Sequence, residues 1–212
     1  MILKWICCTV TKDKRSAFSR AQEAWSKIAA IRGFMAQAGG WDSHNLQRAT
    51  VLGLWEDRSF YKAFMSKHHD RIHGGSRQDQ TYTKCEVRIF DTLFEIPGSK
   101  EDFVEALQAA SILRVARYRQ RPEREKPFCE TQAVHWAPGM KHVGMLGGLF
   151  SKGGEEKTEY LVTTAWRDQK SHKRYRKELF PSLRAASGVD GDIIHLEGAL
   201  LALEKAWWVG RQ

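Results

Sequence analysis

The stretch Leu54-Trp55-Glu56-Asp57 decides the fold, because it returns later in the chain as Ala165-Trp166-Arg167-Asp168. In both copies an apolar segment ends in Trp, and an Asp two residues later is placed to cap a helix. Matching residues lie about 110 positions apart throughout, which indicates that one domain-sized unit was duplicated in order. The other matching segments are residues 2–4 with 112–114, 18–22 with 128–132, 33–35 with 144–146 and 91–98 with 204–210.

Each copy shows the order strand–helix–strand–strand–helix–strand. Apolar and β-branched runs predict the strands, and apolar residues at helical spacing, such as Phe18, Trp25 and Ile28, predict the helices. The first copy is predicted to have strands at 2–10, 34–40, 49–55 and 85–96, and helices at 14–31 and from the cap at Asp57 to Gly75. The second copy is predicted to have strands at 112–119, 143–150, 160–166 and between 199 and 209, a hairpin loop at 151–154, and helices at 127–136, stopped by Pro138-Gly139, and 169–180, interrupted by Pro181.

This order is the split βαβ, or ferredoxin-like, arrangement, in which both helices cover one face of a four-stranded antiparallel sheet. The predicted fold class is therefore α+β, with two tandem ferredoxin-like (βαββαβ) domains at residues 1–98 and 112–212 and a helical linker at residues 99–111. Burying the strand tryptophans, which are Trp5, Trp55, Trp166 and Trp207 or Trp208, is worth several kcal/mol each. We therefore expect the two antiparallel sheets to pack together as an intramolecular α/β barrel.

The composition favours a soluble protein of the reducing cytoplasm. Hydrophobic residues make up 42% and charged residues 28% of the chain, no apolar run is long enough to span a membrane, and the start lacks a secretory-leader pattern. The four cysteines contain no Cys-x-x-Cys pair, so neither a disulfide framework nor a zinc site is expected.

The net charge of +9 favours contact with anions. Basic residues are dense only between Arg167 and Lys177, and the favoured interpretation of that segment is the solvated face of a helix. Ferredoxin-like RNA-binding proteins carry aromatic residues on the open sheet face, and this chain lacks their Lys/Arg-Gly-Phe-Gly-Phe signature, so we do not expect nucleic-acid binding. The glycines between Gly144 and Gly148 lack the spacing of a phosphate-binding loop.

The strand that ends at Trp55, followed by a short acidic cap and the aromatic helix starting Ser59-Phe60-Tyr61-Lys62, resembles the dimeric α/β-barrel superfamily. Within it, the chain is most similar to antibiotic-biosynthesis-monooxygenase-like domains, and as a tandem chain it resembles uncharacterised bacterial two-domain proteins of this type. The resemblance implies a cavity between the sheet and the helices of each half. In the superfamily such cavities serve oxidation of polycyclic aromatic substrates by oxygen without a cofactor, binding and degradation of haem, or isomerisation or binding of small molecules.

The haem-degrading members need an Asn in the first strand, and a Trp and a His on or just after the second helix. His73 falls near the position of that His, but Ala63 or Phe64 occupies the Trp position and the first strand contains no Asn. In the second copy the equivalent of His73 falls near Arg184 or Ala185. The resemblance therefore argues against haem degradation. No cofactor is expected, and haem is kept as an alternative to the aromatic substrate as the bound ligand.

The densest histidine cluster comprises His68, His69 and His73. His69 and His73 lie one helical turn apart, a spacing that can hold a metal, but a third ligand is missing and no metal site is predicted. The cluster also fits an exposed helix C-terminus, where histidine is favoured by the helix dipole. In the enzyme hypothesis, His73 or His69 accepts a proton from a phenolic substrate and makes it reactive toward oxygen. The residues predicted to line the cavity are Trp5, Trp25, Trp55, Phe60 and Phe64.

Three hypotheses for function stay open. The first is a cofactor-independent monooxygenase that acts on a flat aromatic substrate. The second is a non-catalytic or stress-related protein that uses the cavity for haem or another hydrophobic ligand, and the third is a structural paralogue whose cavities are filled by side chains. Because the copies differ, we expect only the first half to keep a site. The expected partner is a small aromatic or hydrophobic ligand, and no membrane contact is expected. The chain is expected to be either a monomer that contains an internal pseudo-dimer or a homodimer.

Overall fold

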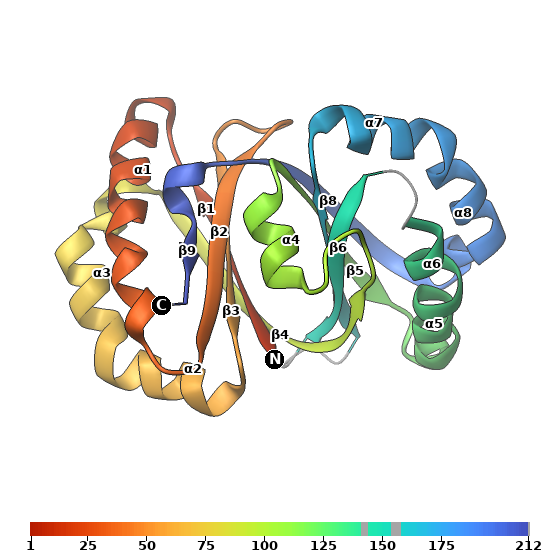
Figure 1. The fold of residues 1–212 in the computed structure, drawn as a ribbon, viewed down its shortest axis with the longest axis horizontal. Coiled ribbons are helices and arrows are strands. Elements are labelled where there is room, and N and C mark those ends of the chain that lie inside the picture. The colour runs from red at the N-terminus through yellow and green to blue at the C-terminus, as the bar shows by residue number, and fades with distance from the viewer. Residues whose placement is uncertain (141–143, 154–157, 212) are drawn as a thin grey trace. The chain divides into compact units, whose positions relative to one another are not determined.

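The computed structural model describes residues 1–140, 144–153 and 158–211, and the chain divides into two compact units (Figure 1). Unit 1 comprises residues 1–89 and 201–212, and unit 2 comprises residues 90–200. Each unit contains one ferredoxin-like set of strands and helices, which confirms the predicted α+β class.

Unit 1 follows the predicted element order. Its elements are β1 (Ile2–Thr9), α1 (Arg15–Glu23), a 3-10 helix (Ala24–Ala30), β2 (Phe34–Asp42), β3 (Arg48–Trp55), α2 (Arg58–Phe64), a π-helical turn (Met65–His69), α3 (Asp70–Ser76), a 3-10 helix (Gln78–Thr81) and the start of β4 (Lys84–Ile96). The chain returns to unit 1 at its end with the last residues of β8 (Ile193–Leu203), a 3-10 helix (Lys205–Trp207) and β9 (Val209–Gly210).

The sheet of unit 1 has the strand order β4-β1-β3-β2. Strand β3 pairs antiparallel with β1 on one side and with β2 on the other, and residues 201–203 of β8 extend the sheet beyond β2. Asp57 caps α2 as predicted, because its carboxylate accepts hydrogen bonds from the backbone N–H groups of Ser59 and Phe60. Gly33 ends the first helical segment with φ +79°, a left-handed conformation that favours glycine.

The helices of unit 1 pack on one face of its sheet, and α1 and α3 lie beside each other there (Figure 1). One buried cluster joins Trp25 and Ile28 to Trp55 and Phe64. In a second cluster, Trp207 packs against Phe18 and Trp41, with ring centroids 5.5 Å away in both cases. The C-terminal segment therefore completes the core of unit 1.

Unit 2 has the matching strand order β8-β5-β7-β6, and residues 90–96 of β4 pair with β6. Its elements are α4 (Phe103–Ala109), β5 (Ile112–Gln120), α5 (Glu125–Thr131), a π-helical turn (Gln132–Trp136), α6 (Ala137–Met140), β6 (Met145–Gly153), β7 (Glu159–Trp166), α7 (Gln169–Glu178), α8 (Phe180–Ser187) and most of β8.

The structure corrects several predicted boundaries. The helix predicted at 14–31 becomes a 3-10 helix from Ala24, and the helix predicted to stop at Pro138 continues to Met140. The strand predicted between residues 199 and 209 is β8, which ends at Leu203, so Trp207 lies in a 3-10 helix and not in a strand, and the short β9 follows it. Residues 151–153, predicted as a hairpin loop, continue β6, while residues 143 and 154 of these predictions lie outside the described residues.

The compact units do not coincide with the two sequence repeats. The last strand of each repeat, β4 in the first and β8 in the second, starts in one unit and ends in the other. The linker helix predicted at 99–111 is α4, which begins after the cap at Asp102 and lies within unit 2. The domains at 1–98 and 112–212, and the packing of their sheets into one barrel, stay predictions.

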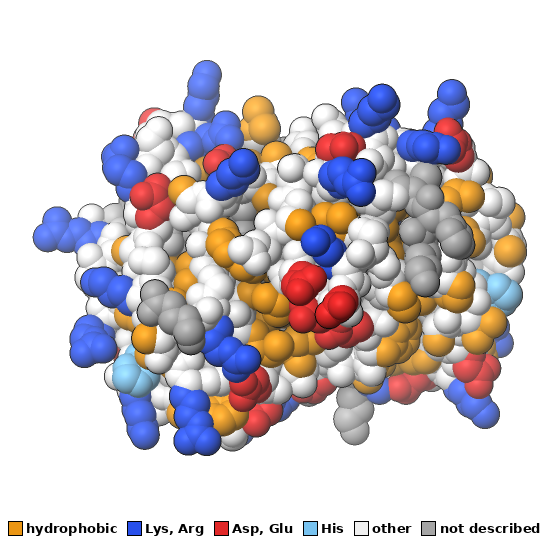
Figure 2. All heavy atoms as spheres, viewed as in Figure 1, with side chains coloured by type: hydrophobic (Ala, Val, Ile, Leu, Met, Phe, Trp, Pro, Cys, Tyr) orange, Lys and Arg blue, Asp and Glu red, His pale blue; other side chains and the backbone are white. Residues whose placement is uncertain are grey.

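In Figure 2, lysine and arginine side chains are spread over the drawn face, while several acidic side chains lie together. In α7, the basic segment of the sequence, Tyr175 is fully buried while Arg174 forms an ion pair with Glu178 at 2.9 Å. Among the helices that the structure describes, none has the length and apolarity needed to cross a membrane.

Candidate functional site

Unit 1 contains a cavity of about 180 Å³ between its sheet and its helices. The floor comes from the inward residues of the strands, because side chains alternate along a strand and Lys4, Ile6 and Cys8 therefore share one face of β1. Helical residues cover the cavity, and its described lining contains no Asp or Glu side chain.

Five of the seven side chains singled out in the sequence meet at this cavity. They are Trp25, Trp55, Phe64, His69 and His73.

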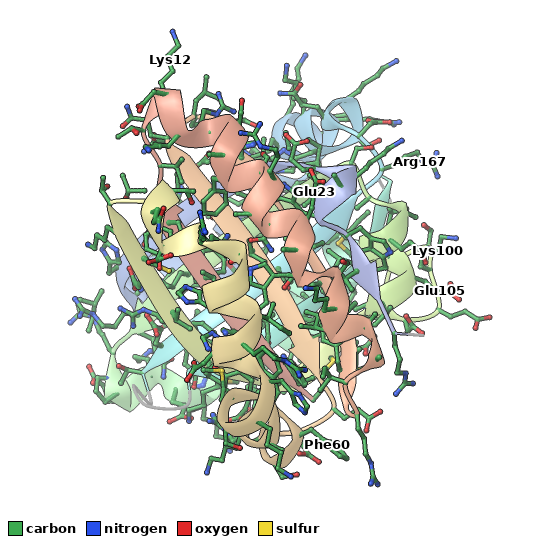
Figure 3. All side chains as sticks on the ribbon, turned by 90° about the vertical axis from the view of Figure 1, so that its left-hand side faces the viewer. Lys12, Glu23, Phe60, Lys100, Glu105 and Arg167 are labelled. Carbon is green, nitrogen blue, oxygen red and sulfur yellow. The ribbon has the colours of Figure 1, made fainter. Side chains whose placement is uncertain are left out.

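The other two lie elsewhere for simple geometric reasons. Trp5 is buried but alternates with Lys4 and Ile6, so it belongs to the opposite face of β1. Phe60 lies at the start of α2, at the lower edge of unit 1 in Figure 3, where it contacts Gly33 and the Arg32 guanidinium stands 5.3 Å from its ring centroid.

Aromatic rings form the walls of the cavity. Trp55 is 1% exposed, stacks on Phe64 with centroids 4.8 Å apart, and meets Phe34 edge-on at 5.3 Å. Flat apolar walls of this kind suit a planar ligand. A cavity of about 150 Å³ is sufficient for benzene, so the present one matches a ligand of roughly one substituted ring.

The two histidines form a parallel pair at the cavity. The rings of His69 and His73 stack with centroids 5.5 Å apart and planes 11° from parallel, and His69 also packs against Trp25 at 5.6 Å. His69 is the last residue of the π-helical turn Met65–His69, His73 follows in α3, and such turns occur often at functional sites. Nδ1 of His69 lies 2.9 Å from Oδ1 of Asp70; if Nδ1 carries the proton, Nε2 is left as an acceptor.

A chain of buried hydrogen bonds fixes one wall. The indole N–H of Trp25 donates to Oε1 of Gln78 at 2.7 Å, and Nε2 of Gln78 donates to Oε1 of Gln22 at 2.8 Å. These hydrogen bonds set the orientation of the indole, and Trp25, Gln78 and Gln22 all line the cavity.

Lys4 is the unexpected member of the lining. Its side chain is 7% exposed in β1, and it forms no hydrogen bond or ion pair with any described residue, although Nζ lies 5.4 Å from the ring centroid of Tyr61. Burial lowers the pKa of Lys4 from 10.5 to about 8, and the charge of nearby Cys85 opposes part of that change. A buried cation without a counterion is costly, which makes this position a candidate for recognition of an anion.

Two cysteines also face the cavity. Sγ of Cys8 donates a hydrogen bond to Sγ of Cys85 at 3.3 Å. This bond lowers the pKa of the Cys85 thiol and raises that of the Cys8 thiol, so Cys85 is the more nucleophilic of the pair.

Neither a metal nor haem suits the described side chains. No group of three potential metal ligands occurs among the described residues. A cavity of about 180 Å³ is also small for a macrocycle of four pyrrole rings, so no step of the chemistry below is routed through haem.

In the corresponding region of unit 2, other aromatic side chains lie against the matching tryptophan. Trp166, the counterpart of Trp55, packs on Tyr175 at 4.9 Å and on His172 at 5.4 Å. Arg184, near the position that matches His73, pairs with Asp190 at 2.9 Å on the surface. The two units therefore differ in the residues that would act as proton acceptors.

Sequence reasoning missed the polar floor, which comprises Lys4, Gln37 and Gly53. One signal was present, because a lysine at an inward position of an apolar strand is unusual. Nothing local indicated that Gln37 and Gly53 would stand beside it.

Comparison with known proteins links the first unit to a sequence family. Residues 2–90 match the family described as a domain of unknown function, DUF4937. The uncharacterized protein YdbC of Bacillus subtilis (strain 168) is 32% identical over 93 residues, which cover 43% of this chain and 78% of YdbC.

Solved structures share the fold at low sequence identity. A protein from Fusobacterium nucleatum, provisionally named a monooxygenase, has a TM-score of 0.79 at 13% identity and covers 99% of this chain and 94% of its own. A protein named anthrone oxidase-like has a TM-score of 0.69 at 11% identity and covers 96% of this chain and 91% of its own. These likenesses identify the fold of the dimeric α/β-barrel superfamily.

Proposed function

This chain belongs to the DUF4937 family, in the antibiotic-biosynthesis-monooxygenase-like dimeric α/β-barrel superfamily, and we propose that unit 1 oxidises a small planar aromatic molecule with oxygen and without a cofactor. The observation that carries the proposal is the aromatic-walled cavity of about 180 Å³ with two stacked imidazoles at its side. The names of the two structural neighbours support the reaction class.

The proposed reaction needs a base and a dry, shaped cavity. His69 or His73 accepts the proton of a phenolic hydroxyl, which leaves an electron-rich anion that donates electrons to oxygen. For phenol itself the balance is C₆H₅OH + O₂ → C₆H₄O₂ (a quinone) + H₂O. One oxygen atom enters the product, the other leaves as water, and the substrate supplies all the electrons.

Asp70 would act on His69 as a positioning residue. When the Asp70 carboxylate accepts a hydrogen bond from Nδ1–H of His69, the free lone pair is on Nε2, on the side of the ring away from Asp70, as in other histidine bases. The Asp70 carboxylate is exposed, with 98% of its side chain accessible, so its effect on the rate should be modest compared with loss of the imidazole.

The test is oxygen uptake by the full chain with a panel of mono- and bicyclic phenols and hydroquinones. We expect the double variant His69→Ala/His73→Ala to reduce kcat by roughly 10²–10⁴-fold, the usual contribution of a general base, with substrate binding largely retained. His44→Ala, in an exposed turn, is the matched control and should leave the rate unchanged.

Binding is followed separately by quenching of tryptophan fluorescence, because Trp25 and Trp55 line the cavity. Turnover that persists in the double variant contradicts the role of the histidines. Binding without oxygen uptake by any phenol favours the second candidate, a non-catalytic ligand-binding protein, which the enclosed aromatic walls support equally well.

A further inference from the structure

One row of residues crosses the sheet of unit 1 beneath the cavity. Lys4 on β1 stands directly opposite Gly53 on β3, and Gln37 on β2 stands opposite the same Gly53 on its other side. Directly paired residues share a face of the sheet, and strands lie about 4.8 Å apart. Two long polar side chains therefore flank a glycine over a width of roughly 10 Å.

Gly53 leaves open space between them. A Cβ atom at this position would meet only Nε1 of Trp55 at 3.8 Å and Cβ of Lys4 at 3.9 Å, which are ordinary contacts. The glycine is thus not required by crowding. Its effect is to leave room at the floor of the cavity for an atom that the protein does not supply.

Three donors surround this space without protein acceptors. Nε2 of Gln37 is buried and has no hydrogen-bond partner in the described part of the chain. The ammonium of Lys4 and the indole N–H of Trp55 likewise form no hydrogen bond with a described residue, and all three residues line the cavity. Buried donors are normally paired, and an unpaired one costs free energy.

In unit 2 the protein itself supplies a hydrogen-bond acceptor at the corresponding position. Its corresponding row is Arg114, Thr164 and Gly148. There the indole N–H of Trp166 donates to Oγ1 of Thr164 at 2.9 Å, two residues earlier on the same strand. In unit 1 the glycine removes that acceptor, so the matching indole of Trp55 is free to donate to a ligand.

We propose that Lys4, Gln37 and Trp55 form an anion subsite above Gly53, which binds the carboxylate or phenolate oxygen of an aromatic ligand in the unit 1 cavity. This inference rests on the proposed function, whose deprotonated substrate carries such an oxygen. Lys4 supplies the charge, while the amide and the indole supply directional hydrogen bonds. The aromatic walls hold the ring, and the subsite selects ligands by charge.

The experiment is calorimetric titration of the full chain with benzoate and with benzyl alcohol, which have similar shape and differ in charge. A third probe, 4-nitrophenol, reports by the colour of its anion whether the site binds a phenolate. The variants are Lys4→Met and Gly53→Thr, the second of which copies the residue of unit 2. Lys12→Met, an exposed lysine at the upper end of the α1 segment in Figure 3, is the matched control.

We expect wild-type protein to prefer benzoate, and Lys4→Met to weaken benzoate binding by about 10- to 100-fold, the usual effect of losing a charged hydrogen bond, while benzyl alcohol binding stays within about 3-fold of wild type. Gly53→Thr should weaken both anionic probes, since its hydroxyl occupies the subsite.

The outcomes separate the two proposals. Equal binding of benzoate and benzyl alcohol in wild type, or an unchanged preference in Lys4→Met, refutes the anion subsite and leaves the aromatic cavity intact. Absence of binding by all three probes overturns the cavity as an aromatic site as well. Benzoate binding without a shift of 4-nitrophenol toward its anion assigns the subsite to carboxylates, and the reverse assigns it to phenolates.

Discussion

Replacing Lys4 by Met should make this protein more stable. Lowering the pKa of Lys4 from 10.5 to about 8 corresponds, at 1.36 kcal/mol for each pKa unit, to a cost of about 3 kcal/mol for holding the charged ammonium inside the fold. Methionine has a similar length and no charge, and imperfect repacking costs about 1 kcal/mol. The expected gain in the free energy of unfolding is about 2–3 kcal/mol at pH 7.

The pH dependence of that gain gives the sharper test. Below about pH 8 the lysine is charged in both the folded and the unfolded chain, so the folded state carries the full penalty. Between about pH 8 and 10.5 the folded chain releases its proton before the unfolded chain does, and wild-type stability rises relative to the variant. Above 10.5 the penalty is absent.

Urea unfolding of wild type, Lys4→Met and Lys12→Met from pH 6 to 10.5 measures this difference directly. Titration of groups that do not interact with Lys4 affects all three proteins equally and cancels in the comparison, whereas Cys85 interacts electrostatically with Lys4 and is therefore replaced by Ser in all three proteins. Equal stability of wild type and Lys4→Met at pH 7, or a gap that stays constant to pH 10.5, would refute the assignment of Lys4 as a buried, uncompensated cation. A residue kept at such a cost is what a binding role predicts.

Three further predictions follow from the packing of unit 1. Gly33→Ala should destabilise the protein by about 1–3 kcal/mol from backbone strain alone, because φ is +79° at this position. The new Cβ would also lie 2.1 Å from Cγ of Phe60, and Phe60→Ala in that background should relieve this collision but not the strain. Full recovery of the free energy of unfolding in urea would contradict the strain. Trp55→Ala should cost about 3–5 kcal/mol in the same assay, and a loss below about 1 kcal/mol would mean that the wall repacks. Oxidation with diamide should form a disulfide between Cys8 and Cys85, whose sulfurs lie 3.3 Å apart. A thiol count should then show that two of the four thiols are lost in wild type but not in Cys8→Ser. Equal loss of thiols in both proteins would contradict this disulfide.

The sequence by itself determined the repeated element order and the main anchors of the fold. The spacing of Phe18, Trp25 and Ile28 and the cap at Asp57 act within a few residues, so local physics is enough to place them. Local signals were weaker at the ends of elements, where the turn 151–153 became strand and the helix continued past Pro138.

Only the tertiary structure decided which side chains meet. His69 and His73 could be paired from their helical spacing, but the row of Lys4, Gly53 and Gln37 combines one residue from each of three strands. Its existence depends on the register of two strand pairings, and a slip of one residue would turn each side chain to the other face. The passage of β4 and β8 between the two units is likewise invisible in the repeat, because it depends on which sheet edge is free to accept each strand end, and only long-range contacts decide that.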